Sequence, residues 1–384
     1  MKPGYKQTEV GVIPEEWEVK LLPEVTHFRG GKAHEQHISD AGPFVCVNSK
    51  FISTEGKVRK YATANFCSAK KGDVLMVMSD LPNGKALAKA FLADRDNLYA
   101  VNQRVCALTA YRDYSPCYLL YTLNRNPYFL KFDDGVSQTH LLNNVFRQCP
   151  LPLPPTLAEQ DAIAGALSDA DALIDSLEQL IAKKRLLKQG AMQDLLTGKK
   201  RLPGFEGVWE EATFSSKLRH HSGDSTLIKG KLSSTPIGGY YPGFSASGQD
   251  VWLPSYAQEG DALVVSAVGS RCGKCFRASG KWSAIANTHI VWPNAGVVSI
   301  AYLMLYIHDE EFWTKGGSGQ PFVKFKESFE KVIAWPSLPE QTAIAEALTE
   351  MDGELAVLEQ RREKTRALKQ GMMQELLTGR TRLI

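Results

Sequence analysis

The 384-residue chain is longer than a typical domain of roughly 100–200 residues, so we expect two or more folded cores. Hydrophobic content of 43% and charged content of 23% are ordinary for a globular protein, and a net charge of +3 is too small to indicate nucleic-acid binding by itself. No apolar run approaches the ~18 residues of a membrane span and the polar start does not resemble a signal peptide, so we expect a cytoplasmic protein with no membrane partner.

The first predicted segment covers residues 1–150 and carries 19 Lys and Arg against 15 Asp and Glu. Short apolar runs alternate with glycine turns, a pattern that is typical of β-strands. The clearest strand, Val74–Met78, follows a Gly-Asp turn, and Tyr118–Leu123 has the pattern of a short amphipathic helix. These features predict a mixed α+β core.

A long helix is predicted within the second segment, residues 151–201. Its apolar residues recur at alternating spacings of four and three, which places them on one seam of a coiled-coil-like helix. The seam residues are Ile163, Leu167, Ile174 and Leu177. The basic residues of the second half, such as Lys184 and Arg185, suit either a solvated face or contact with phosphates.

The third segment, residues 202–335, repeats the plan of the first. Gly260-Asp261 precedes an apolar strand, and Tyr302–Ile307 repeats the short helix. The charges of residues 205–335 balance at 12 basic against 12 acidic side chains. The fourth segment, residues 336–384, repeats the long helix. Its seam residues are Ile344, Leu348, Leu355 and Leu358.

The two long helices are copies of one sequence. Glu159–Leu202 aligns with Glu340–Leu383 at a constant offset of 181 residues, with roughly 25 identities in about 44 positions. A long helix with one apolar seam is unstable alone, so we expect the copies to pair. The predicted fold is α+β, with two globular domains joined by two long antiparallel, coiled-coil-like helices in a pseudo-two-fold arrangement. Whether the seams face partner proteins or each other stays open.

With this duplication the chain resembles the specificity subunit of type I restriction-modification systems. The resemblance rests on LPLPPTLAEQDAIA and WPSLPEQTAIA ahead of the helices, on the paired LLTG endings, and on GVIPEEW and RLPGFEGVW at the starts of the two globular segments. It implies two target-recognition domains, each of which reads one half of a split double-stranded DNA site, with the helices as spacers.

The resemblance also implies partner proteins. Two modification subunits would methylate adenine with S-adenosylmethionine, and restriction subunits would use ATP and Mg²⁺ to translocate and cleave. The chain itself would have no catalytic residues, no metal and no cofactor. Its helix seams are the candidates for binding the partners.

Candidate base-reading residues come from polar loops that adjoin glycine or serine. Base reading needs forked or amide side chains, with Arg suited to guanine and Asn or Gln to adenine. For each residue the alternative is an ordinary solvent-exposed turn. In the first globular segment the candidates are Asn48, Lys50, Asn83, Lys85, Ser137, Gln138 and His140. In the second they are Ser247, Gln249, Ser270, Arg271, Lys274, Ser318, Gln320 and Lys324.

Motifs of enzymes and metal sites are incomplete in the sequence. Cys272 and Cys275 lack the second ligand pair of a structural zinc site. Asn126–Phe129 resembles the Asn-Pro-Pro-Tyr/Phe box of adenine methyltransferases but lacks its second proline, and no glycine-rich cofactor loop follows a strand. Two alternatives to a DNA-reading subunit remain: a self-sufficient DNA methyltransferase, and a structural adaptor whose globular segments bind proteins.

Overall fold

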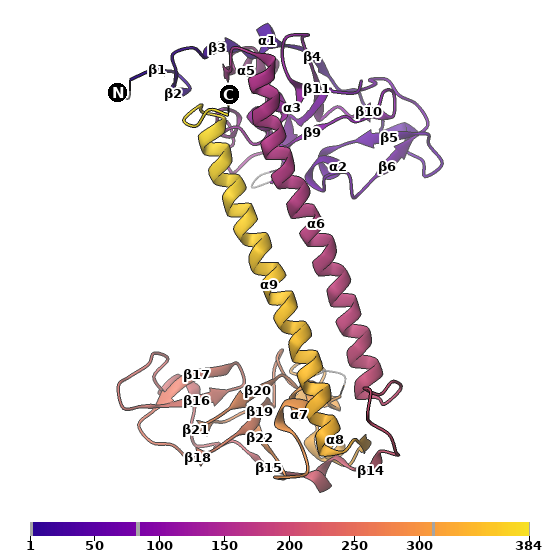
Figure 1. Ribbon diagram of the computed structural model, residues 1–384, viewed down its shortest axis with the longest axis vertical. Coiled ribbons are helices and arrows are strands. Elements are labelled where there is room, and N and C mark those ends of the chain that lie inside the picture. Colours follow the sequence, from indigo (N-terminus) through magenta and orange to yellow (C-terminus); the bar gives the residue numbers. More distant parts are fainter. Residues whose placement is uncertain (1–2, 82–84, 309–311, 384) are drawn as a thin grey trace. The chain divides into compact units, whose positions relative to one another are not determined.

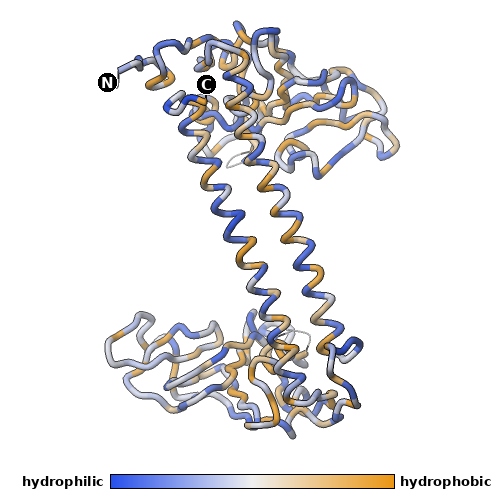
Figure 2. Tube along the Cα trace, viewed as in Figure 1, coloured by the Kyte–Doolittle hydropathy of each residue, from blue (hydrophilic) through white to orange (hydrophobic). Residues whose placement is uncertain are grey.

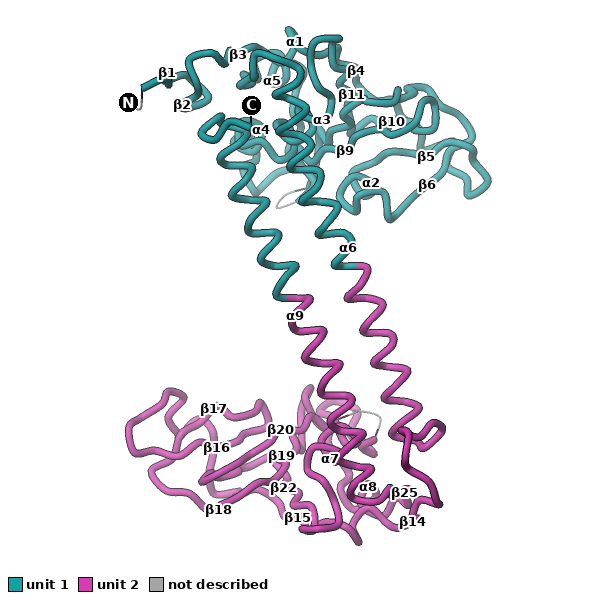
Figure 3. The backbone as a smooth tube through the Cα atoms, in the orientation of Figure 1, with its two compact units in different colours: residues 1–178, 360–384 teal, residues 179–359 magenta. Residues whose placement is uncertain are grey.

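The computed structural model describes residues 3–81, 85–308 and 312–383 (Figure 1). The chain forms two compact units: unit 1 is Met1–Glu178 with Gln360–Ile384, and unit 2 is Gln179–Glu359 (Figure 3). Each unit combines one globular segment with part of each long helix, because these helix parts pack on it. The predicted boundaries at residues 150, 201 and 335, which separate the helices from the globular segments, stay a prediction.

Unit 1 is built on two β-sheets with short helices. One sheet is antiparallel in the order β4-β11-β7-β9, and the other, β10-β5-β6, contains the parallel pair β10 and β5. The strands are β1 (Tyr5–Thr8), β2 (Gly11–Pro14), β3 (Glu18–Leu21), β4 (Thr26–Gly30), β5 (Phe44–Val47), β6 (Lys60–Ala62), β7 (Val74–Val77), β8 (Ser79–Asp80), β9 (Ala90–Leu92), β10 (Tyr99–Val101), β11 (Val105–Ala110), β12 (Thr139–His140) and β13 (Pro150–Leu153). The short helices are α1 (Leu22–Val25), α2 (Ser49–Ser53), α3 (Pro116–Leu123), α4 (Pro127–Leu130) and α5 (Asn143–Arg147).

Unit 2 repeats this plan. Its antiparallel sheet has the order β15-β22-β19-β20, and the sheet β17-β16-β21-β18 contains the parallel pair β16 and β21. The strands are β14 (Glu210–Thr213), β15 (Leu218–Ser222), β16 (Tyr241–Ser245), β17 (Gly248–Leu253), β18 (Gln258–Glu259), β19 (Ala262–Ser266), β20 (Cys275–Ala278), β21 (Lys281–Ala284), β22 (Thr288–Pro293), β23 (Lys315–Gly316), β24 (Phe322–Val323) and β25 (Val332–Trp335). The short helices are α7 (Ile300–Ile307) and α8 (Phe325–Phe329).

The predicted local elements are confirmed in both units. The strands that follow the two Gly-Asp turns are β7 and β19, and every residue in them is buried. The two short amphipathic helices are α3 and α7, and each begins after a serine whose side chain accepts a hydrogen bond from the backbone of the first turn. Apolar burial and helix capping therefore explain the same local structure twice.

The two long helices are α6 (Leu157–Leu196) and α9 (Leu338–Leu376). Hydrophilic and hydrophobic residues alternate along both of them (Figure 2). In unit 1 the first half of α6 pairs with the end of α9, where Asp171 bonds to Lys369 and Glu178 to Arg366. The residue that comes later in α6, Glu178, pairs with the residue that comes earlier in α9, Arg366, so the two helices run antiparallel here.

The same kind of pairing joins the helices within unit 2. Lys188 bonds to Asp352 and Arg185 to Glu359, again with rising numbers in one helix opposite falling numbers in the other. These pairs are largely exposed, so they set register more than they stabilise the fold.

The seams of the helices are packed inside the units. Ile163 and Leu167 lie in the core of unit 1 together with Leu376, and Ile344 and Leu348 lie in that of unit 2. Leu177 and Leu355 are buried as well, and Ile174 and Leu358 are half-buried. The buried seam side chains are therefore already satisfied within the chain and are not available to a partner protein, contrary to their proposed role in partner binding.

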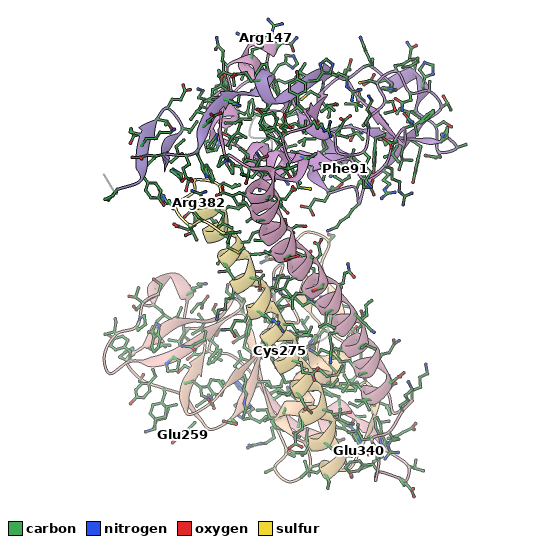
Figure 4. All side chains as sticks on the ribbon, turned by 45° about the horizontal axis from the view of Figure 1, so that its top comes forward. Phe91, Arg147, Glu259, Cys275, Glu340 and Arg382 are labelled. Carbon is green, nitrogen blue, oxygen red and sulfur yellow. The ribbon has the colours of Figure 1, made fainter. Side chains whose placement is uncertain are left out.

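A buried carboxylate at the start of each helix meets an arginine beyond the end of the other helix. In unit 1, Glu159 is 1% exposed and accepts hydrogen bonds from Nε and Nη2 of Arg382. In unit 2, Glu340 is 1% exposed and is held in the same way by Arg201, and it also accepts a hydrogen bond from Nε1 of Trp209 at 3.1 Å. Figure 4 labels Glu340 near the start of α9 and Arg382 beyond its end.

The Arg382→Ala substitution tests this buried pair. It leaves the buried carboxylate of Glu159 without its counter-ion, so we expect the free energy of unfolding of unit 1 to fall by about 3 kcal/mol, as measured by urea unfolding. Arg366→Ala, in α9 of the same unit, is the matched control, because its pair with Glu178 is exposed and is worth less than about 1 kcal/mol. Equal losses in both variants would contradict the prediction.

Candidate nucleic-acid interface

Three segments of unit 1 meet at one edge of its sheets: the turn 102–104 before β11, the end of β7 and the strand β12. Met78 donates its backbone N–H to the carbonyl oxygen of Arg104 at 2.8 Å, and Leu141 donates to the carbonyl oxygen of Met78 at 2.8 Å. The pairing of β8 with β12 continues this connection. Backbone hydrogen bonds hold the segments together, so their side chains need not do so.

Unit 2 contains the same arrangement. Ala267 donates its backbone N–H to the carbonyl oxygen of Asn287 at 2.9 Å, and Val323 donates to the carbonyl oxygen of Ala267 at 2.9 Å. Asn287 ends the turn before β22, as Arg104 ends the turn before β11. In each unit we call this set of a turn, a strand end and the segment beside it the three-segment edge.

A glycine makes room for the turn in each unit. A Cβ on Gly31 would lie 2.1 Å from the carbonyl oxygen of Asn102, and a Cβ on Gly223 would lie 2.3 Å from that of Ile285. Any other residue would therefore push the turn away from the strand that supports it. The position of the three-segment edge depends on these two close approaches.

The predicted residues after Asp134 lie at the three-segment edge of unit 1. Gln138 is exposed, but its Nε2 donates to the hydroxyl of Ser79 at 2.9 Å, whereas His140 is exposed in β12. Ser137 donates its hydroxyl to the carboxylate of Asp134. Hydrogen bonds from Ser137 and Val136 lower the pKa of Asp134, so this loop carries a negative charge that disfavours phosphate.

The loop after β8 adjoins the same edge. Asp80 accepts a hydrogen bond from the backbone N–H of Ala86 at 2.7 Å, and Lys85 is exposed beside this contact. Asn83 lies outside the described residues. Of this predicted pair, Lys85 alone has a described side chain, which is exposed and makes no hydrogen bond or ion pair with the residues that the structure describes.

The start of α2 also reaches the turn of unit 1. Asn102 donates its backbone N–H to the carbonyl oxygen of Val47 at 3.0 Å, one residue before Asn48. The Oδ1 atom of Asn48 accepts the N–H of Phe51 and caps α2, while Lys50 is exposed on the first turn of that helix. Asn48 therefore has a structural use that the sequence did not indicate.

Backbone and side-chain contacts join the predicted loops of unit 2. Arg271 donates from Nη1 to the carbonyl oxygen of Ser247 at 2.9 Å, and Gly269 donates to the carbonyl oxygen of Pro321 at 2.8 Å. Three loops that are distant in sequence thus form one surface. Its exposed predicted residues are Ser247, Gln249, Ser270, Arg271, Ser318 and Gln320.

The two predicted lysines of unit 2 differ in how they are held within the chain. Lys324 is ion-paired with Glu327 at 2.9 Å, so much of its charge is compensated within the chain. Lys274 is half-buried in the turn before β20, where its backbone N–H donates to the carbonyl oxygen of Arg271. Neither contact prevents these lysines from binding a phosphate, but Lys324 would first have to break its ion pair with Glu327.

A histidine pair lies close to the three-segment edge of unit 2 and adds no charge to it. His289 is 7% exposed, and its Nε2 lies 3.1 Å from Nδ1 of His220. Burial lowers the pKa of His289 to about 4, and partial burial also lowers the pKa of His220. Both rings are therefore neutral at pH 7 and cannot attract phosphate.

Sequence reasoning missed the last residues of the two turns, Arg104 and Asn287. Both are exposed at the three-segment edges. They directly precede buried strands and do not stand in a glycine- or serine-rich loop, which was the signal used for the other candidates. Their correspondence shows only in the backbone hydrogen bonds, because the two turns share no residue in sequence.

The motifs set aside as enzyme or metal sites have structural uses. Asn126 caps α4 by accepting the N–H of Tyr128 at 2.8 Å. Cys272 and Cys275 are buried, and burial raises the pKa of the Cys275 thiol, which disfavours the thiolate that a metal would need. Within residues 3–81, 85–308 and 312–383, no three His, Cys, Asp or Glu side chains come together as a metal site. No helix in the described part of the chain is long and apolar enough to cross a membrane.

Comparison with known proteins gives matches along the whole chain. Residues 14–184 match the family model described as the type I restriction modification DNA specificity domain. The MjaVIII type I restriction enzyme specificity subunit of Methanocaldococcus jannaschii is 24% identical, over 97% of this chain and 94% of that protein. The putative MjaX specificity subunit of the same organism is 25% identical, over 99% of this chain and 97% of that protein.

Solved structures share the fold. The S subunit of a type I restriction-modification system from M. genitalium superposes with a TM-score of 0.61 at 16% identity, covering 98% of this chain and 99% of that one. The HsdS subunit from Thermoanaerobacter tengcongensis superposes with a TM-score of 0.50 at 18% identity, covering 96% and 98%. Long helices combined with mixed α/β segments are therefore an established architecture.

The Gly31→Ala substitution tests the close approach at the turn of unit 1. Its Cβ would collide with the carbonyl oxygen of Asn102, so we expect a loss of about 1–3 kcal/mol in the free energy of unfolding and faster hydrogen exchange in the turn 102–104. Gly30→Ala is the matched control, because a Cβ on Gly30 would have no heavy atom within 4 Å. If both alanines are tolerated equally, the turn does not depend on this contact.

Proposed function

We propose that this chain is a specificity subunit of a type I restriction-modification system and that its two units read the two halves of an asymmetric, bipartite DNA site. The chain is a sequence-specific DNA-recognition subunit and is not itself an enzyme. The proposal is carried by the three-segment edge, which recurs in both units with different side chains. One scaffold with two sets of side chains suits two unlike half-sites.

In this proposal the long helices set the gap between the half-sites. A helix of 40 residues such as α6 is about 60 Å long. The ion pairs that join the helices in unit 1 recur in unit 2 at the 181-residue offset of the repeat, which supports a pseudo-two-fold, coiled-coil-like spacer. Two units that differ in their side chains and are related in this way suit an asymmetric site, whereas a symmetric dimer would suit a palindrome.

Partner subunits would supply the chemistry. We place S-adenosylmethionine on two modification subunits, and ATP with Mg²⁺ on the restriction subunits, in a complex that works in the cytoplasm, where it meets the cell's DNA. The net charge of +3 and the internal ion pair of Lys324 favour weak DNA binding by this chain alone, so the modification subunits would close around the duplex.

The surface for these partners would lie on the helices but outside their buried seams. Large apolar side chains that remain exposed there are Leu157, Leu173, Leu180, Leu186, Leu187, Val357 and Leu368. Exposed leucines on long helices are suited to packing against helices of another chain.

The Arg271→Ala substitution tests base reading by unit 2. The hydrogen bond to Ser247 orients the guanidinium, so we expect the variant to lose about 1–3 kcal/mol of discrimination at one base pair of one half-site. Sequences selected by the assembled complex from a random duplex library measure this. Arg277→Ala is the control, because Arg277 is exposed in the same unit but paired with Asp261. A loss of affinity that is equal for all sequences would make Arg271 a phosphate contact instead.

Lengthening the helices tests the spacer. Seven residues inserted at matched positions of both α6 and α9 add about 10 Å, so we expect the selected gap to grow by about three base pairs with both half-sites unchanged. The same insertion in the exposed loop at Gly238-Gly239 should leave the gap as it is. If the wild-type complex selects no bipartite sequence, the proposed function itself is wrong; an unchanged gap would reject the spacer role alone.

A further inference from the structure

The turn before β11 in unit 1 is fixed at both of its ends. Lys32 donates its backbone N–H to the carbonyl oxygen of Val101 at 3.0 Å, directly before the turn. At the other end, the carbonyl oxygen of Arg104 accepts the N–H of Met78 at 2.8 Å. The backbone that carries the Arg104 side chain is therefore held in place by the sheets.

The turn before β22 in unit 2 is fixed by the same two bonds. Asp224 donates its backbone N–H to the carbonyl oxygen of Ala284 at 2.9 Å, and Ala267 donates to that of Asn287 at 2.9 Å. Arg104 and Asn287 thus occupy one position of the scaffold that the two units share. This correspondence comes from the hydrogen bonds, since the sequences of the two turns differ at every residue.

The side chains at this position are free, although the backbone is fixed. Arg104 and Asn287 are exposed, and neither side chain has an ion pair or hydrogen bond with the residues that the structure describes. Arg271 and Lys324, by contrast, both bind other groups of the chain. A free hydrogen-bonding group on a rigid backbone is the arrangement that specific recognition requires.

We infer that Arg104 reads a guanine in the half-site of unit 1 and that Asn287 reads an adenine in the half-site of unit 2. The inference rests on the proposed function and names two of its specificity-determining residues. The guanidinium fork of Arg104 can donate to O6 and N7 of guanine. The amide of Asn287 can donate to N7 of adenine and accept from its N6 amino group.

Two other roles for this position account for the side chains less well. A position that served to neutralise phosphate charge would need a cation in both units, whereas Asn287 is uncharged and could only donate a hydrogen bond to a phosphate. Asn287 has a φ of +66°, which asparagine tolerates better than most residues, so its role could be confined to the backbone. Glycine would satisfy that backbone role without an amide, and this difference separates the two explanations.

The first pair of variants addresses Arg104. Arg104→Lys keeps the charge but removes the fork, and Arg104→Gln removes both. For each variant we expect discrimination to fall about 5- to 150-fold at one G·C pair in one half-site, with the other half-site unchanged. Arg112→Ala is the matched control, because Arg112 is exposed beyond the opposite end of β11. The readout is the set of sequences selected by the complex with modification subunits.

The second pair of variants addresses Asn287. Asn287→Gly and Asn287→Asp both accept the positive φ, so each should fold with an unchanged melting temperature. Both remove the amide donor, and we expect each to lose discrimination at one A·T pair of the half-site that Arg104 does not affect. Unchanged melting together with an altered base preference separates a base contact from a role in the backbone.

Specific outcomes overturn the inference. Unchanged preferences in the Arg104 and Asn287 variants would reject it, as would equal loss of affinity for all sequences, or changes that fall in the same half-site. Affinity that is kept in Arg104→Lys but lost equally for all sequences in Arg104→Gln would make Arg104 a phosphate contact. In each of these cases the wild-type complex and Arg112→Ala still select a bipartite site. If the wild-type complex selects none, the proposed function fails before the inference is reached.

Discussion

The buried pairs of glutamate with arginine constrain the rest of this architecture. Glu159 and Glu340 are almost fully buried, and a buried carboxylate is tolerated only when it is paired. In each unit the counter-ion comes from beyond the end of the other long helix, as Arg382 or Arg201. Neither helix can therefore begin correctly unless the other helix ends beside it. Antiparallel association follows from this requirement before any apolar contact is considered.

The glutamine next to each glutamate connects the same point to the globular part. Gln160 accepts the backbone N–H of Ser115 at 2.9 Å, and Gln341 accepts that of Ser299 at 2.8 Å; these serines cap α3 and α7. Two adjacent residues thus bind the other helix and the unit's own core. Burial of Ile163 and Ile344 then packs the helices into those cores. The duplicated Glu-Gln pair has a physical purpose in each unit.

The sequence predicted the elements well, because apolar periodicity and caps are local signals. The two long helices α6 and α9, the buried strands β7 and β19, and the helices α3 and α7 all followed from short-range patterns. The residues that pack against the helix seams could not be predicted in this way, since periodicity shows that one face is buried but not what covers it. The loops carrying Arg271 and Ser247 are joined by contacts between distant segments, which no local pattern indicates. Arg104 was missed because it directly precedes a buried strand and does not stand in a glycine- or serine-rich loop.

Side chains at the three-segment edges fall into two groups with different consequences for specificity. Asn48 caps a helix and Gln138 binds Ser79, so changing them would disturb the scaffold as well as any DNA contact. The side chains of Arg104 and Asn287 make no hydrogen bond or ion pair with the described residues, and backbone hydrogen bonds fix their turns. A fold that holds its recognition loops through main-chain hydrogen bonds leaves these positions open to substitution. Different side chains can then stand on one scaffold without loss of stability, and the proposed reading of two unlike half-sites requires this property.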